Sequence, residues 1–148
     1  MLGVLAEQGG DAPLSPQPDV TQISSLVEQL RQAGMAVELS VEGEPRAISG
    51  GVSVAAYRIV QEALTNVLKH ANGAPSRVLV RWTDDGLEVV VVDQGPVQDG
   101  AGAEAAAGRG LAGMRERTAM YGGTLDAHPG LDRGYVIRAR LPLEPEGL

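Results

Sequence analysis

Four polar residues recur at every fourth position in one stretch of the chain: Arg58, Glu62, Asn66 and His70. Apolar residues at three- and four-residue spacing accompany them, which predicts a helix packed on a core. Side chains four apart lie on one helix face, so these four should form a column, with Lys69 beside its end. A carboxylate, an amide and nitrogen bases in one column suit an anionic ligand that carries a metal. A solvated face held by ion pairs explains the same pattern, and this segment alone favours that interpretation.

A second candidate site follows the apolar stretch 87–93, where Asp93 leads into Gln94 and Gly95. The carboxylate of Asp93 can accept a hydrogen bond from an exocyclic amine such as that of adenine. Gly95 would let a flat ring approach the backbone closely. Residues of these types also form ordinary turns, and the sequence does not choose between the two interpretations.

The third candidate is residues 108–113, whose sequence GRGLAG matches the pattern G-x-G-x-x-G. The dinucleotide-binding version must directly follow a strand, whereas here it follows a stretch rich in glycine and alanine, 96–107, which we expect to be a mobile loop. We therefore reject that interpretation. A glycine-rich helix entry still offers backbone amides and the positive end of a dipole, which suit phosphate oxygens. A flexible helix start without any ligand is an equally simple explanation.

Composition narrows the function classes. The 148 residues contain no cysteine, which excludes disulfides and thiolate metal sites, and they suit one domain. The formal charge of −7 argues against a nucleic-acid backbone as partner, and an aromatic content of 3% argues against a platform for stacked bases. The sequence has no apolar run long enough for a membrane span and no signal peptide. We therefore expect no membrane contact by this chain and a cytoplasmic location.

Hydrophobic periodicity and turn residues predict three helices and about five strands. The predicted helices cover residues 23–33 (capped by Asp19 or Thr21 and stopped by Gly34), 53–71 (capped by Ser53) and 110–121 (stopped by Gly122-Gly123). The predicted strands cover residues 37–41, 76–83, 87–93, 124–128 and 135–141, with Asp84-Asp85-Gly86 as a tight, positive-φ hairpin turn. This order predicts an α+β fold: a two-layer α/β sandwich with a mixed sheet of about five strands and three helices on one face.

The three candidate sites, in this order and spacing, resemble the ATP-binding catalytic domain of bacterial sensor histidine kinases, a branch of the gyrase/Hsp90/kinase/MutL (GHKL) superfamily with the Bergerat fold. Residues 58–71 look like the asparagine box of the nitrate-sensor-like class, and residues 108–117 look like its lid box. Residues 122–125 and 138–142 fit as well, so the resemblance covers roughly residues 37–143.

The resemblance implies a role for each candidate residue. Asn66 would ligate Mg²⁺, Lys69 would neutralise phosphate, and His70 would lie near the ribose of ATP. Asp93 would recognise the adenine amine, and Gly95 would make room for the ring.

In the flexible ATP lid, the resemblance assigns the hinge and the phosphate-facing helix start to Gly108, Arg109, Gly110, Leu111 and Gly113. Glu62 stands where related ATPases hold a carboxylate that activates the nucleophile, so we assign it a polarising, catalytic role. Two departures from the family pattern, Pro96 and Tyr135, leave the shape of the adenine pocket open.

The implied organisation is a linker remnant from an upstream dimerisation helix (1–18), the kinase-type domain (19–143) and a tail (144–148). Its function would be to bind ATP·Mg²⁺ and donate the γ-phosphoryl group to a histidine of its own dimerisation domain. Relay to a response regulator with a helix-turn-helix output domain would follow. The only histidines, His70 and His128, do not lie in acceptor-like sequences, so we do not expect this chain to phosphorylate itself.

Two alternatives stay open. The chain could be a nucleotide-binding regulatory module without phosphotransfer, or it could belong to another ATPase or serine kinase of the superfamily. Arg58 and the Lys69-His70-Ala71 signature favour the histidine kinase over both. The sequence leaves open whether the intact protein is anchored to a membrane.

Overall fold

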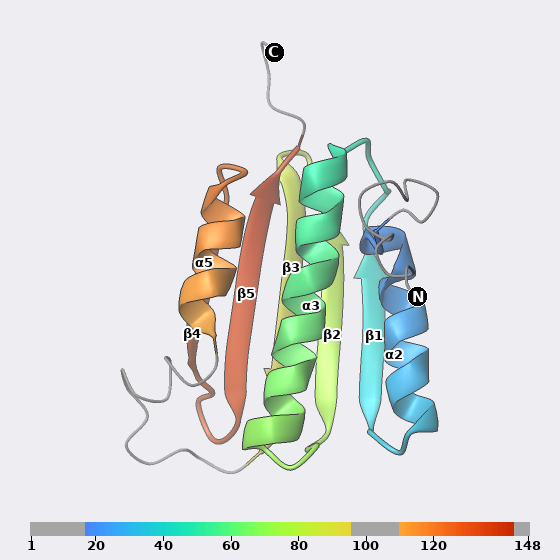
Figure 1. Cartoon of the computed structure of the whole chain (residues 1–148), viewed down its shortest axis with the longest axis vertical. Helices are drawn as coiled ribbons and strands as arrows, with labels where there is room; N and C mark the ends of the chain where they lie inside the picture. The colour runs from blue at the N-terminus through green and yellow to red at the C-terminus, as the bar shows by residue number, and fades with distance from the viewer. Residues whose placement is uncertain (1–16, 96–109, 144–148) are drawn as a thin grey trace, which may run out of the picture.

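The computed structural model describes residues 17–95 and 110–143. Within these ranges, helices lie on one face of a five-stranded sheet, as Figure 1 shows. The elements in chain order are η1 (Val20–Gln22), α2 (Ile23–Gln32), β1 (Val37–Glu42), α3 (Gly50–His70), β2 (Ser76–Trp82), β3 (Gly86–Asp93), α5 (Leu111–Ala119), β4 (Thr124–Pro129) and β5 (Tyr135–Pro142). The predictions for residues 1–16 of the linker, the tail, the loop 96–107, Gly108 and Arg109 fall outside the described residues.

The sheet has the strand order β1-β2-β3-β5-β4. The pair β1–β2 is parallel, whereas β2–β3, β3–β5 and β5–β4 are antiparallel. The prediction of a mixed sheet in a two-layer sandwich is therefore confirmed. Placing β5 between β3 and β4 is a feature that the alternating pattern of the strands does not reveal.

Helix α3 forms the centre of the helical layer, and its inner side is apolar and almost completely buried. The helix begins at Gly50 and is capped by Ser49, whose side chain accepts a hydrogen bond from the backbone of Val52 at 3.1 Å. The prediction that Ser53 caps it was wrong. Ser53 lies one turn inside the helix, where its buried hydroxyl accepts a hydrogen bond from Val20 N at 3.1 Å and ties η1 to α3.

The hairpin between β2 and β3 lies at the predicted place, but the expected conformation of its turn was wrong. None of Asp84, Asp85 and Gly86 has a positive φ. Instead the Thr83 hydroxyl accepts hydrogen bonds from the amides of Asp85 at 3.2 Å and Gly86 at 3.0 Å, which closes the turn without a left-handed residue. Gly86 is needed for another reason, because a side chain there would overlap the carbonyl oxygen of Leu141 on β5.

Strand β1 is at the edge of the sheet and is less buried than its sequence predicts. Its alternation holds for Val37, which is 3% exposed, but Val41 is 59% exposed. Val41 lines an apolar hollow of about 240 Å³ beside the start of α2.

The described segments that carry the predicted site residues lie toward one end of the sandwich. The C-terminal ends of α3 and β3 and the N-terminal end of α5 all lie there, at the lower end of the view in Figure 1.

None of the helices in residues 17–95 and 110–143 combines the length and hydrophobicity needed to span a bilayer.

Candidate functional site

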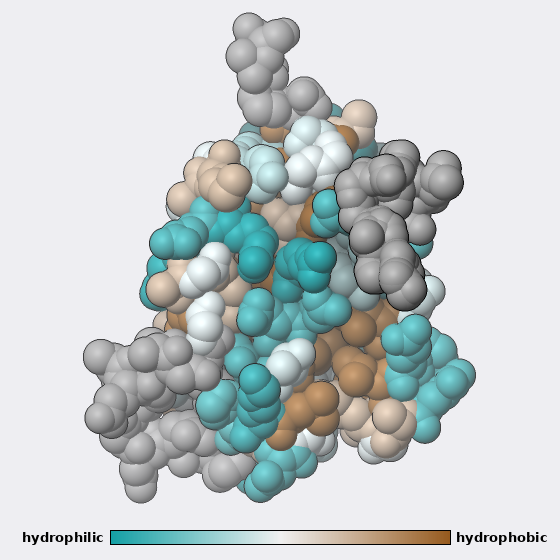
Figure 2. Space-filling model, viewed as in Figure 1, coloured by the Kyte–Doolittle hydropathy of each residue, from teal (hydrophilic) through white to brown (hydrophobic). Residues whose placement is uncertain are grey.

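The four residues of the predicted column all lie on α3, but their side chains do not share one environment. Asn66 is 5% exposed, whereas Arg58 and His70 are exposed. Four residues advance an α-helix by about 40° more than one full turn, so the column winds around the helix from step to step. Lys69 is also exposed, and the outward side of α3 is largely hydrophilic in Figure 2.

Glu62 faces helix α5 across the helical layer. Its Oε1 lies 3.9 Å from Nη1 of Arg117, and its Oε2 would be 3.6 Å from a β-carbon built at Gly110. The carboxylate therefore lies against the N-terminal end of α5, one turn before Asn66 on the same helix. Arg117 ends the stretch 108–117 that resembles the lid box, but the sequence assigned it no role of its own; it stands seven residues, or about two helical turns, after Gly110.

Asp93 ends β3 with a buried carboxylate, 4% exposed, whose Oδ1 accepts a hydrogen bond from Gly95 N at 2.8 Å. The turn interpretation of these residues is thus correct in itself. Gly95 is required by packing as well, since a β-carbon there would be 2.8 Å from the β-carbon of Ala71. This close approach brings the Asp93 turn to the end of α3, where Asn66 lies.

Gly134 also shapes this end of the molecule, although it belongs to none of the motifs recognised in the sequence. It has a φ of +75°, and a β-carbon there would overlap the carbonyl oxygen of Asp93 and lie 3.1 Å from its Oδ1. The turn that holds Gly134 is closed by a hydrogen bond of 2.9 Å from Gly130 N to Gly134 O. Tyr135, one of the departures from the family pattern, begins β5 and is 6% exposed within the core.

Helix α5 begins at the glycine-rich stretch. Gly110 is its N-cap with a φ of 70° and supplies no side-chain cap for the first-turn amides. Leu111, 1% exposed, anchors this end of the helix in the core. Gly113 is exposed, and a β-carbon there would have no neighbour within 4 Å. The start of α5 therefore combines a fixed backbone with open space, which suits a bulky anion near the amides.

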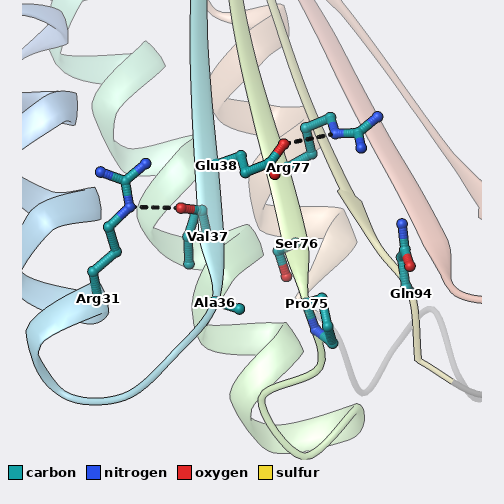
Figure 3. Close-up of a pocket in the computed structure, with 8 residues that line it drawn as sticks. All are labelled: Arg31, Ala36, Val37, Glu38, Pro75, Ser76, Arg77 and Gln94. Atoms are coloured by element: carbon teal, nitrogen blue, oxygen red, sulfur yellow. Dashed lines mark hydrogen bonds and ion pairs between the residues drawn. The ribbon is translucent and has the colours of Figure 1, made fainter.

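A hollow of about 350 Å³ lies at the same end of the sheet, between the starts of β1 and β2, and is lined in part by Gln94 (Figure 3). Its two arginines point away from one another and are both engaged. Arg31 Nε donates to Val37 O at 2.7 Å, and Arg77 Nε lies 3.4 Å from Glu38 Oε1. Because no cations converge there, this hollow is a poor match for a phosphate group.

Residues 51–145 match the family described as histidine kinase-, DNA gyrase B- and HSP90-like ATPases. The chain belongs to this family. The match covers the candidate residues on α3, β3 and α5, so the resemblance stated from the sequence is confirmed at the level of the family. The nitrate-sensor-like class stays a prediction.

Named relatives of this ATPase domain are sensor kinases. The sensor histidine kinase LnrJ of Bacillus subtilis (strain 168) is 33% identical over 80% of this chain and 31% of its own length. The sensor histidine kinase YxjM of the same organism is 31% identical over 84% of this chain and 30% of its own length. The chain therefore spans about a third of these relatives.

The fold agrees with a solved structure, that of the ATP binding domain of PrrB from Mycobacterium tuberculosis. The TM-score is 0.61 at 20% identity, over 84% of this chain and 94% of that one. At this identity the likeness shows the fold alone.

Proposed function

We propose that this ATPase domain binds ATP with Mg²⁺ in the space between the ends of α3 and β3 and the start of α5, and that it is the catalytic part of a sensor histidine kinase. The observation that carries the proposal is the meeting of three separate chain segments at one end of the sandwich. A β-carbon at Gly95 would be 2.8 Å from Ala71, just after α3, and one at Gly110 would be 3.6 Å from Glu62, so the segments that carry Asn66, Asp93 and the first amides of α5 lie close together.

The residues present fit a magnesium ion that arrives with its nucleotide. Among residues 17–95 and 110–143, no group of three or more His, Cys, Asp or Glu gathers that could hold a metal on its own. Magnesium needs no such group, because it keeps several waters and binds phosphate oxygens with one or two protein ligands. The side-chain oxygen of Asn66 is a hard ligand of this kind, and Lys69 and His70 stand at the same helix end.

In the intact protein, we propose that the γ-phosphoryl group passes to a histidine of the dimerisation domain and then to a response regulator. Glu62 would polarise the attacking nitrogen, since its carboxylate on α3 faces Gly110, the N-cap of α5. We favour Asp93 as the residue that binds the adenine amine, because its carboxylate is buried at the end of a strand. Water cannot replace a hydrogen bond that is lost at such a position.

The substitution Asp93→Asn tests the nucleotide site. We expect the affinity for ATP·Mg²⁺, measured by calorimetry, to fall by at least about tenfold, because a charged acceptor for the amine is replaced by an amide. Asp126→Asn on β4 is the matched control, because Asp126 is exposed and away from the site. Equal affinities for the parent chain and Asp93→Asn would refute the adenine role.

The kinase activity needs a separate test, since a regulatory module would also bind ATP. The chain would be joined to the acceptor helices of its intact protein and incubated with γ-labelled ATP. Phosphohistidine would support the kinase, whereas ATP binding without any label would favour the regulatory module.

A further inference from the structure

Arg117 has an unusual environment for an arginine on an exposed helix. Its side chain is 36% exposed, yet its Nη1 is buried and makes no hydrogen bond. Oε1 of Glu62 lies 3.9 Å from this nitrogen, which is too long for a hydrogen bond. Because this guanidinium nitrogen is buried beside a carboxylate, we infer that its positive charge serves to balance the negative charge of Glu62.

The carboxylate of Glu62, which is on α3, faces α5 at two points. Gly110 and Arg117 are seven residues apart, so they lie on one side of α5 about two turns from each other. Gly110 approaches Oε2 of Glu62 and Arg117 approaches Oε1. The core side of α5 is formed by other residues, Leu111, Met114 and Thr118, which leaves Arg117 free to face α3.

We propose that Arg117 is a positioning residue: it holds the carboxylate of Glu62 against α5 and offsets its charge where the triphosphate must enter. The inference rests on the proposed function, since it assumes that ATP binds between α3 and α5. A bare carboxylate at this place would repel a polyanion, and a cation at 3.9 Å removes most of that repulsion at longer range.

The proposal predicts a particular pattern of nucleotide affinities. Arg117→Met should weaken ATP·Mg²⁺ by about fivefold, the upper range for a partly exposed charge pair, and should weaken ADP less, because ADP lacks the γ-phosphate. The loss should disappear when Glu62→Gln is added, since no carboxylate charge then remains to offset. Arg117→Lys, which keeps the charge, should retain most of the affinity.

The experiment is a double-mutant cycle on the 148-residue chain, with fluorescent ATP and ADP analogues and thermal unfolding of every variant. Arg115→Met is the matched control, because Arg115 is an exposed arginine on the same helix. A fivefold loss in Arg117→Met that Glu62→Gln reverses, with little effect of Arg115→Met, would support the proposal.

Two results would overturn it. A loss of affinity that persists in the Glu62→Gln background would make Arg117 a direct phosphate contact. A change in thermal stability without any change in affinity would make it a structural residue only. Failure of the proposed function is a distinct outcome, because then the parent chain itself would not bind either nucleotide.

Discussion

The contact between Gly134 and Asp93 allows a demanding test of how the site is held. In Gly134→Ala, the new β-carbon overlaps the carbonyl oxygen of Asp93 and stands 2.7 Å from its carbonyl carbon. Neither atom belongs to a flexible side chain, so the turn or the end of β3 must move. The left-handed φ of +75° adds its own cost for any residue with a β-carbon.

The expected magnitude is the sum of these two effects. A left-handed residue with a β-carbon costs roughly 1 to 2 kcal/mol, and forced overpacking roughly 1 to 3 kcal/mol, which together give about 2 to 5 kcal/mol. For a chain of this size that corresponds to a melting temperature lower by about 6 to 15 °C. Displacing Asp93 should also weaken ATP binding about tenfold.

Gly34→Ala is the matched control. Gly34 has a φ of +103°, but a β-carbon there would meet nothing within 4 Å. It should therefore carry only the backbone cost, about 1 to 2 kcal/mol, and should leave ATP affinity unchanged. The entropy that alanine removes from the unfolded chain is the same in both variants and cancels in the comparison.

Thermal unfolding followed by circular dichroism and titration with a fluorescent ATP analogue measure the two effects. Equal losses of stability in Gly134→Ala and Gly34→Ala would refute the overlap with Asp93. A large loss of stability in Gly134→Ala with undiminished ATP affinity would show that Asp93 does not contribute to the nucleotide site.

Two further predictions concern the metal and the open face of the sheet. Asn66→Asp should change ATP affinity more in the presence of Mg²⁺ than in its absence, as measured by calorimetry, and equal changes would remove Asn66 from the metal site. On the uncovered sheet face, the carboxylate of Glu88, with its side chain 11% exposed, lies within 3.1 to 3.4 Å of Arg81, Arg138 and Arg140. Glu88→Gln should lower the free energy of unfolding, measured in urea, by about 1 to 2 kcal/mol, because it leaves three cations together without the carboxylate. The control variant Glu42→Gln changes a more exposed carboxylate and should lower this free energy by about 0.5 kcal/mol or less. Added salt should reduce the difference between these two variants, and a difference that does not respond to salt would contradict its electrostatic origin.

The sequence alone determined the elements, their order and the family. The period of the apolar residues distinguishes helices from strands, and the stops at Gly34 and Gly122 are local, with φ values of +103° and +79°. The motifs on α3 and at the start of α5 are contiguous, so they could be read without any knowledge of packing. One failure was local as well: Ser49, not Ser53, caps α3, because both serines satisfy the same short pattern.

The tertiary structure decided which side chains meet. It buries Asn66 while it exposes Arg58 and His70, which the spacing of four had placed together. The contacts of Glu62 with Arg117 and of Gly134 with Asp93 join residues far apart in the chain. The contact of Gly134 with Asp93 depends on the pairing of β5 with β3 and on the register of those two strands. Periodicity reports only which face of an element is buried and not what packs against it, so strand order and register become visible only in the folded molecule.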